Sequence, residues 1–392
     1  MNNLRKKVCF VTGTRAEYGL LKHLMREVSK SNSLSLQIIA TGTHLSINHG
    51  YTIDEIIEDG FTIDSTIDID IEDDSNNSTC LSLSKLIENI SIVFDRLSPD
   101  LIVVLGDRYE LLGIVSAATI HRIPVAHIHG GEITEGAFDE GIRHAITKLS
   151  HIHFVASDPY RKRVIQLGEN PSNVFNVGGL GVDALSRLKV LQKKEIEKQL
   201  CLQFKNRNLL ITYHPLTQAT SEESQREITE LIKALSKYKE TLQIFTMPNS
   251  DPGNKYISEI INFYVSKNEF AFSFNSLGQK LYLSCLANVD AVIGNSSSGL
   301  LEAPSFKIGT INIGERQKGR LMAKSIINVP GDSKSISNAI YEIYTSRYQQ
   351  TLKSTSNPYG KGGSSSKIVE ILNTINLESI TKKPFFDLKI DN

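Results

Sequence analysis

Short apolar runs alternate with amphipathic stretches along the whole chain. Short runs in which nearly every residue is apolar are typical of strands buried on both faces of a parallel sheet. We predict one series of such strands in the first part of the chain and another further on, at Val8–Val11, Leu36–Ala40, Leu101–Leu105, Val125–Ile128, Ile152–Val155, Leu209–Thr212, Leu242–Thr246, Ala291–Ile293 and Thr310–Ile313.

The stretches between these runs repeat their apolar residues with the period of a helix. They predict helices at Tyr18–Val28, Tyr109–His121, Ile142–Leu149, Ser224–Tyr238, Tyr256–Val265 and Lys280–Ala287. Buried strands that alternate with helices indicate an α/β protein, in which parallel sheets carry helices on both faces. The acidic, polar stretch Asp68–Ser78 is expected to be an exposed loop or a poorly ordered excursion.

A chain of 392 residues is too long for one compact core, so two domains are expected. The glycines of Gly178–Gly181 precede a charged helix around Lys189–Lys198, which suggests a hinge. Near the end, the flexible stretch 356–366 leads to an amphipathic segment, Ile368–Ile375, that could return to the first domain. We therefore expect one domain from residues 1–178 together with a C-terminal helix at about 363–392, and another from residues 179–362.

The charge balance and the hydropathy exclude several classes of partner. The 43 Lys and Arg residues match 43 Asp and Glu residues, so the whole molecule has no attraction for nucleic acid or for an anionic membrane. No stretch approaches the ~20 apolar residues of a membrane-spanning helix, and the N-terminal apolar run is too short for a signal peptide. The four cysteines are scattered without a CxxC pair, which favours reduced thiols. We expect a cytoplasmic protein.

Two parallel sheets whose strands end at a shared cleft would bind a ligand there, so the polar residues after each strand are the candidates for function. After the first strand comes TGTRAEYG, a turn into a helix, in which Arg15 suits a phosphate group. A tight turn with a solvated arginine is the alternative. After the third predicted strand, Asp107 could cap the next helix or act as a general base.

The stretch HIHGGEITEGAFDE (residues 127–140) concentrates histidines and acids around glycines. His127 and His129 alternate along a strand, so they would share one face. Zinc sites draw three or four protein ligands, and no supporting Cys/His pattern is present, so we expect no metal. Acid–base chemistry fits better, because neighbouring carboxylates and imidazoles shift one another's pKa values. The alternative is a polar loop whose acids cap the following helix.

In the second half, His214 follows a strand and precedes Pro215, where it could meet a ligand or be purely structural. Further on, the turn Ser296–Ser298 leads into a helix, and serine hydroxyls with backbone N–H groups could hold phosphate oxygens. Glu302 could bind the hydroxyls of a ribose, and Arg316 could contact phosphate or base. Ordinary helix capping by the serines is the alternative. Together, the two halves indicate a nucleotide-sugar enzyme.

The motifs also resemble a known family. In order along the chain they are GTRAEYG, VLGDRYE, HIHGGE with TEGxxDExIRHAITKLSH, RVIQLGE, YHP, IGNSSSGLLE and INIGxRQKGR. From about residue 7 to residue 372 they are similar to the hydrolysing UDP-N-acetylglucosamine 2-epimerases, and best to the bacterial sialic-acid branch. This resemblance implies a glycosyltransferase-B-like fold of two Rossmann-type domains facing a central cleft, with no metal or redox cofactor.

The resemblance also implies a reaction, in which UDP-N-acetylglucosamine and water give N-acetylmannosamine and UDP. Loss of the C2 proton with anti elimination of UDP would give 2-acetamidoglucal, to which water then adds. By position, Arg15, Ser296, Ser297, Glu302 and Arg316 match UDP contacts, and His214 matches a histidine near the diphosphate. Arg108 and Ser298 are further candidates for binding UDP.

Asp107 and Asp139 match carboxylates implicated in the chemistry, and His214 is a further candidate for it. The position of His129 is a catalytic glutamate in the animal branch of the family, so either His129 or the nearby Glu132 would take over proton transfer here. A homo-oligomer, either a dimer or a tetramer, is expected.

Three other interpretations stay open at this point. A close variant of the enzyme would act on UDP-N,N′-diacetylbacillosamine, since a C4 amide and a C6 methyl group are distinguished by the shape of the pocket. A glycosyltransferase of the same fold would need an acceptor and usually has a basic first domain. A nucleotide-sugar sensor without catalysis would have no need of Asp107, Glu132 and Asp139, which are all present.

Overall fold

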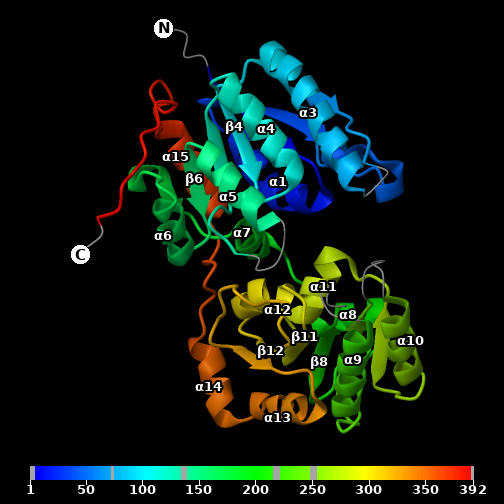
Figure 1. Cartoon of the computed structure of the whole chain (residues 1–392). Coiled ribbons are helices and arrows are strands. Elements are labelled where there is room, and N and C mark those ends of the chain that lie inside the picture. Colours follow the sequence, from blue (N-terminus) through cyan, green and yellow to red (C-terminus); the bar gives the residue numbers. More distant parts are fainter. Residues whose placement is uncertain (1–4, 72–74, 134–138, 215–220, 248–253, 390–392) are drawn as a thin grey trace. The chain divides into compact units, whose positions relative to one another are not determined.

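The computed structural model describes residues 5–71, 75–133, 139–214, 221–247 and 254–389. It contains two compact units, one of Met1–Ser186 with Gly362–Asn392 and the other of Arg187–Lys361. In each unit a parallel sheet lies between layers of helices (Figure 1). Each unit is described by itself, so the expected cleft between the two sheets stays a prediction.

The first unit has a seven-stranded sheet in the order β3-β2-β1-β4-β5-β6-β7, and every pairing in it is parallel. Its strands are β1 Lys6–Thr12, β2 Leu34–Thr41, β3 Ser65–Ile67, β4 Leu101–Leu105, β5 Val125–Ile128, β6 Ile152–Val155 and β7 Val174–Asn176. Its helices are α1 Arg15–Ser29, α2 Ile53–Glu58, α3 Asn76–Leu97, α4 Tyr109–Ile120, α5 Asp139–Leu149, α6 Asp158–Gln166, α7 Leu180–Arg187 and α15 Ser364–Thr374, with short 3₁₀ helices η1 Gly42–Leu45, η2 Ile47–His49 and η3 Pro171–Asn173.

The second unit has a six-stranded sheet in the order β10-β9-β8-β11-β12-β13, again with parallel pairings. Its strands are β8 Asn208–Thr212, β9 Leu242–Thr246, β10 Ala271–Phe274, β11 Ala291–Gly294, β12 Gly309–Ile313 and β13 Ile326–Val329. Its helices are α8 Lys193–Leu200, α9 Ser221–Leu235, α10 Asn254–Val265, α11 Gly278–Leu286, α12 Ser298–Leu301, α13 Ser333–Ile343 and α14 Ser346–Ser354, with one short 3₁₀ helix, η4 Ala303–Phe306.

The strand order decides where a ligand can bind in each unit. In both sheets the order reverses direction once, between β1 and β4 in the first and between β8 and β11 in the second. The loops that leave two such strands diverge to opposite faces and open a crevice at the carboxyl ends of the strands. The residues after β1, β4, β8 and β11 are therefore the first to inspect.

All nine predicted strands are present, and four others were missed: β3, β7, β10 and β13. These four lie at the edges of the two sheets. Edge strands are short and face solvent, so they lack the continuous apolar run that marks a central strand. The predicted loop at Asp68–Ser78 extends too far, because α3 begins at Asn76 with Ser75 as its N-cap; residues 72–74 lie outside the described ranges.

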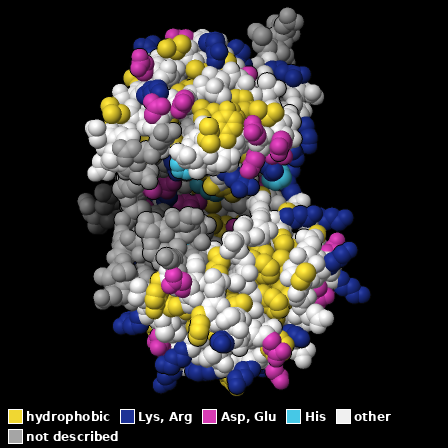
Figure 2. Space-filling view, turned by 90° about the vertical axis from the view of Figure 1, so that its right-hand side faces the viewer, with side chains coloured by type: hydrophobic (Ala, Val, Ile, Leu, Met, Phe, Trp, Pro, Cys, Tyr) yellow, Lys and Arg dark blue, Asp and Glu magenta, His cyan; other side chains and the backbone are white. Residues whose placement is uncertain are grey.

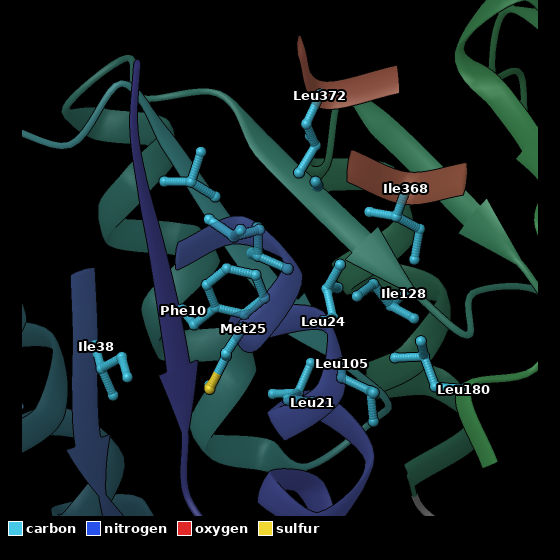
Figure 3. Packing of buried hydrophobic residues seen from close by; sticks show 14 of the residues in the cluster. Phe10, Leu21, Leu24, Met25, Ile38, Leu105, Ile128, Leu180, Ile368 and Leu372 are labelled. Atoms are coloured by element: carbon cyan, nitrogen blue, oxygen red, sulfur yellow. The ribbon is translucent and has the colours of Figure 1, made fainter. Parts of the chain in front are cut away.

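The last helix, α15, packs onto the first unit. Its Ile368 and Leu372 are fully buried in one core with residues of α1 and α7, and they point toward Leu24, Ile128 and Leu180 (Figure 3). Helix α7 belongs mostly to this unit as well, since Leu180 lies in the same core. The contacts thus divide the chain after Ser186, whereas the sequence-based division at residue 178 precedes α7.

The surface of the described residues agrees with the balanced composition. Figure 2 shows Lys and Arg side chains interspersed with Asp and Glu on the face that it displays. No helix in the described ranges is both long and apolar enough to cross a membrane. The four cysteines are free.

Candidate active site

The turn after β1 is closed by its own helix. Thr14 is the N-cap of α1, and its Oγ1 accepts a hydrogen bond from the Glu17 N–H at 3.2 Å. In return, Glu17 Oε2 accepts hydrogen bonds from the N–H groups of Gly13 (2.7 Å) and Thr14 (3.2 Å). The sequence suggested that N–H groups of this turn could bind a phosphate. In this capping box, however, the N–H groups of Gly13 and Thr14 already donate to the carboxylate of Glu17. Arg15 points outward, with its side chain 72% exposed and paired with Glu55.

The turn after β4 places a second buried acid beside the first. Glu110, 1% exposed, accepts hydrogen bonds from Arg108 Nε at 3.2 and 3.1 Å and from Nη2 at 2.5 Å. Burial raises the pKa of Glu17 to about 7, an effect that the Gly13 N–H and Arg108 oppose and that Glu110 reinforces. Close to neutral pH, this edge of the sheet therefore contains a carboxyl group that can exchange a proton.

Asp107 is bound to Arg143 of α5. The Arg143 side chain is 7% exposed, the Asp107 side chain 26%, and an Nη2–Oδ2 ion pair joins them. Asp107 does not cap α4, whose N-cap is Arg108. Asp139 begins α5, and burial raises its pKa, with Arg108 lowering it and Glu110 raising it. Asp139 thus interacts with Arg108 and Glu110, while Asp107 is paired with the buried Arg143.

The two histidines do not share a face, which corrects the expectation from the sequence. His127 is fully buried, and its ring nitrogens contact the Gly106 carbonyl oxygen (2.8 Å) and Thr147 Oγ1 of α5 (3.1 Å). His129 follows the end of β5 with φ 65°, and its Nε2 accepts a hydrogen bond from Leu180 N of α7 at 3.3 Å. The left-handed residue breaks the alternation, so the two rings contact different helices.

These contacts give the histidines different roles. Burial lowers the pKa of His127 to about 3, so this ring is neutral. Its role is structural, because its contact with Thr147 joins β5 to α5. Because both of its nitrogens are occupied, His127 is not available to a metal. His129 Nδ1 lies 3.5 Å from Glu132 Oε1, so the structure pairs these two candidates at the end of β5.

In the second unit, Asn295 connects the ends of three strands. Its side chain is fully buried, accepts from the His214 N–H at 2.8 Å and donates to the His214 carbonyl oxygen at 2.7 Å. Its own carbonyl oxygen accepts from Arg316 Nη1 (3.1 Å) and Gln317 Nε2 (2.9 Å). Asn295, directly before the serine turn, thus contacts both His214 and Arg316. Pro215, which follows His214, lies outside the described residues.

The serine turn itself leads into α12. Ser297 is the N-cap of this short helix but makes no capping hydrogen bond with its side chain. Capping therefore does not account for Ser297. Gly294 before the turn has φ 138°, and a Cβ there would lie 1.9 Å from the Thr212 carbonyl oxygen, so only glycine lets β11 pass β8 this closely.

Three buried polar atoms near the turn, Ser298 Oγ, Glu302 Oε2 and the Tyr282 hydroxyl, form no hydrogen bond of good geometry within the described residues. They are neighbours, since Ser298 lowers the pKa of both Glu302 and Tyr282 against the larger effect of burial, which raises it. Buried polar groups are nearly always paired in folded proteins. Hydrogen bonding within this group of three is incomplete, so a polar ligand, such as a sugar hydroxyl, would complete it.

Several residues of these networks were missed in the sequence. Glu17 could have been found, because T-x-x-E before a helix is the capping-box signature. Glu110 and Arg143 stood in the quoted motifs, but nothing in their spacing shows which groups they contact. Asn295 also stood in a quoted motif, directly before Ser296, whereas Tyr282 is brought to the site only by the fold of the second unit.

Comparisons with known proteins agree with this geometry. A family model for UDP-N-acetylglucosamine 2-epimerases matches residues 26–373. Over 98% of the chain and the whole of the relative, the sequence is 42% identical to a GDP/UDP-N,N′-diacetylbacillosamine 2-epimerase (hydrolyzing) of Campylobacter jejuni. The chain belongs to the UDP-N-acetylglucosamine 2-epimerase family. The family predicted from the motifs, and with it an enzyme of the hydrolysing 2-epimerase type, is confirmed.

Two further relatives bear on the branch. Polysialic acid biosynthesis protein P7 of Escherichia coli is 37% identical over 98% of both chains. UDP-N,N′-diacetylbacillosamine 2-epimerase (hydrolyzing) of Legionella pneumophila is 34% identical over 95% of this chain and 97% of its own. These relatives are therefore named either for polysialic acid biosynthesis, which is the branch that the motifs predicted, or for the epimerisation of diacetylbacillosamine, which is its close variant.

Solved structures support the fold. A UDP-GlcNAc 2-epimerase from Neisseria meningitidis bound to UDP-GlcNAc superposes with a TM-score of 0.75 at 22% identity, over 93% of this chain and 99% of that one. A protein from Listeria monocytogenes described as a UDP-N-acetylglucosamine 2-epimerase gives a TM-score of 0.79 at 18% identity, over 95% and 96% of the two chains. The predicted fold, glycosyltransferase-B-like with two Rossmann-type parallel sheets, is confirmed.

Proposed function

We propose that this epimerase converts UDP-N-acetylglucosamine and water into N-acetylmannosamine and UDP, as a step toward sialic acid. The proposal rests on membership of the family together with the acids and cations that follow the strands at the two points where sheet order reverses. The 37% identity to a polysialic acid biosynthesis protein supports the sialic-acid branch.

The first half of the reaction removes the C2 proton and breaks the bond between C1 and the UDP oxygen, leaving a C1–C2 double bond. C2 of the sugar is weakly acidic, so a positioned base must act while UDP departs. Asp107 is our candidate for this base, because Arg143 holds its carboxylate in place. Cations around the diphosphate stabilise the charge that develops as the C1–O bond breaks.

In the second half, a water oxygen bonds to C1 and gives up one of its protons to a base, while an acid adds a proton to C2 on the face opposite to the one that the first proton left. Asp139 is a candidate acid, because burial raises its pKa. His129 and Glu132 lie 3.5 Å apart and form a second candidate pair for proton transfer. His214 is the remaining catalytic candidate, and Asn295 fixes its backbone.

UDP binding is assigned to polar groups of both units. Ser296, Ser297, Ser298 and Arg316 would hold phosphate oxygens, with His214 near the diphosphate and Glu302 on the ribose. Arg15 and Arg108 would supply positive charge from the first unit. Ser298 Oγ and Glu302 Oε2 support this assignment, since neither atom makes a hydrogen bond of good geometry within the described residues, and a ligand hydroxyl or phosphate would complete their hydrogen bonds.

A product analysis tests the proposal. Purified protein is incubated with UDP-N-acetylglucosamine in deuterated water without any acceptor, and the products are followed by NMR. Free N-acetylmannosamine with deuterium at C2, together with UDP, is the expected result. Absence of free sugar from this donor and from UDP-N,N′-diacetylbacillosamine would reject a hydrolysing epimerase, and a requirement for an acceptor would favour a glycosyltransferase.

UDP-N,N′-diacetylbacillosamine is a second candidate substrate, because the relative with 42% identity is named for it. The two donors differ at C4 and C6 only, so competition between them in one incubation measures the ratio of kcat/KM directly. A higher kcat/KM for the diacetylated donor would place the enzyme on the route to legionaminic acid instead.

A homo-oligomer is also proposed, either a dimer or a tetramer. Helix α3 exposes two large apolar side chains, Leu81 (62%) and Ile92 (65%), which would be buried if this helix formed the interface. Light scattering coupled to size exclusion tests this, and a mass of one chain would contradict it. A cytoplasmic location stays a prediction.

A further inference from the structure

Two buried carboxylates border the same glycine at the carboxyl edge of the first sheet. A Cβ built on Gly13 would lie 3.5 Å from Glu17 Oε2 and 3.9 Å from Glu110 Oε1. Glu110 has a salt bridge to Arg108, whereas Glu17, 6% exposed, has none among the described residues. The second oxygen of Glu17, Oε1, is buried and makes no hydrogen bond in the described part of the chain.

The charges of this cluster do not balance when both acids are ionised. Two carboxylates face one guanidinium, in surroundings from which water is largely excluded, and an uncompensated buried charge is costly. A proton on Glu17 Oε1 removes the excess charge and leaves Oε2 free to accept from Gly13 and Thr14. Burial accordingly raises the pKa of Glu17 to about 7, while the charge of Arg108 counteracts this rise.

The other ionisable groups around the cluster lie on three elements. Arg108 and Glu110 come from the start of α4, and Asp139, at the start of α5, interacts with both of them. On the side of β2 and η1, His44 contacts Thr12 Oγ1, and burial lowers the pKa of His44 to about 4, so it stays neutral. Among these groups, Arg108 is thus the cation that lowers the pKa of Glu17.

We propose that binding of a nucleoside diphosphate beside Arg108 is coupled to the uptake of one proton from solvent by Glu17. This inference rests on the role in UDP binding proposed above for Arg108. A phosphate beside the guanidinium adds negative charge and offsets the positive field that favours the ionised form of Glu17. The O–H bond forms at Oε1, and UDP itself is not changed.

Linkage gives the sign of the pH dependence. Because the complex holds the proton more tightly than the free protein does, UDP affinity is highest when Glu17 is protonated and falls as pH rises. If the bound phosphate raises the pKa by one unit from about 7, affinity falls about threefold between about pH 7.5 and about pH 9.

Calorimetry tests the coupling directly. UDP is titrated into the full-length protein at about pH 8 in several buffers with different ionisation enthalpies. At that pH the terminal phosphate of free UDP is almost fully ionised, since its pKa is ≈ 6. The slope of observed enthalpy against buffer enthalpy gives the number of protons taken up, which is expected to be about 0.4 per UDP for a one-unit rise in pKa.

Two variants provide the comparison. Glu17→Gln keeps an oxygen that accepts from the Gly13 N–H and places an amide N–H₂ where Oε1 carries its proton. Because glutamine does not titrate, UDP should bind to this variant with proton uptake near zero. Glu88→Gln changes an exposed glutamate of α3 and should leave uptake as in the wild type. Wild-type protein that binds UDP without uptake at about pH 8 overturns the inference, whether or not Glu17→Gln folds.

Uptake that persists in a folded Glu17→Gln variant also overturns it, since another group would then take the proton. Either result leaves the proposed function intact. Absence of UDP binding by the wild type is a different outcome, because it removes the proposed function and the inference together.

Discussion

Replacement of Asp183 by alanine should loosen the C-terminal helix from the first unit. Asp183 lies in α7, is 1% exposed, and receives hydrogen bonds from Gly363 N (2.6 Å), Ser365 N (3.2 Å) and Ser365 Oγ (2.5 Å). It thereby caps the N-terminus of α15, whose own N-cap residue is a glycine with no side chain. Alanine leaves buried donors without an acceptor.

The magnitude follows from these contacts. A hydrogen bond to a charged group contributes roughly 1.5–3 kcal/mol, and an N-cap contributes about 1 kcal/mol. Ser365 Oγ can rotate to another partner, so we count the two amides and expect a loss of about 3 kcal/mol in the free energy of unfolding of the first unit. Asp183→Asn retains one acceptor oxygen and should lose about half as much.

Because the chain has no tryptophan, unfolding in urea is best followed by far-ultraviolet circular dichroism. Hydrogen exchange measured by mass spectrometry locates the effect, and amides of Ile368–Thr374 should lose protection first. Asp54→Ala, at an exposed aspartate of α2, is the matched control and should change stability by less than ~0.5 kcal/mol. A loss below ~1 kcal/mol for Asp183→Ala, with α15 still protected, would refute the reasoning.

Three further predictions concern the proposed chemistry. Asp107→Asn should keep UDP binding and lower kcat by about 10²-fold or more, the usual contribution of a general base; unchanged turnover in the UDP-release assay would remove Asp107 from that role. Ser298→Ala should weaken UDP binding about tenfold in calorimetry, because a hydrogen bond from Ser298 Oγ to the ligand would be lost; unchanged affinity would remove Ser298 from the UDP site. Activity should survive extensive treatment with a chelator, and elemental analysis should find no stoichiometric zinc; loss of activity restored by zinc would reverse the expectation.

The central strands of both sheets could be read from the sequence alone. The run Leu101–Leu105 is apolar throughout, and Val125–Ile128 is apolar except for the buried His127, because helices cover both faces of the sheet and every residue of these strands is buried. The edge strand Ser65–Ile67 has a neighbouring strand on one side only and contains few apolar residues. Its place in the sheet depends on its pairing with β2. The alternation of strands and helices was sufficient for the fold class, whereas the edges needed tertiary contacts.

The chemistry divides in the same way. Position after a strand was enough to nominate Asp107, His129 and the serine turn, because parallel strands all deliver their carboxyl ends to one edge. The contacts between these side chains were decided only by folding. Arg143, which lies 36 residues after Asp107, reaches it from a helix, and the left-handed backbone at His129 turns its ring away from His127. Sequence spacing determines which residues arrive at an edge, but the partners that set their charge come from distant segments whose contacts no local pattern encodes.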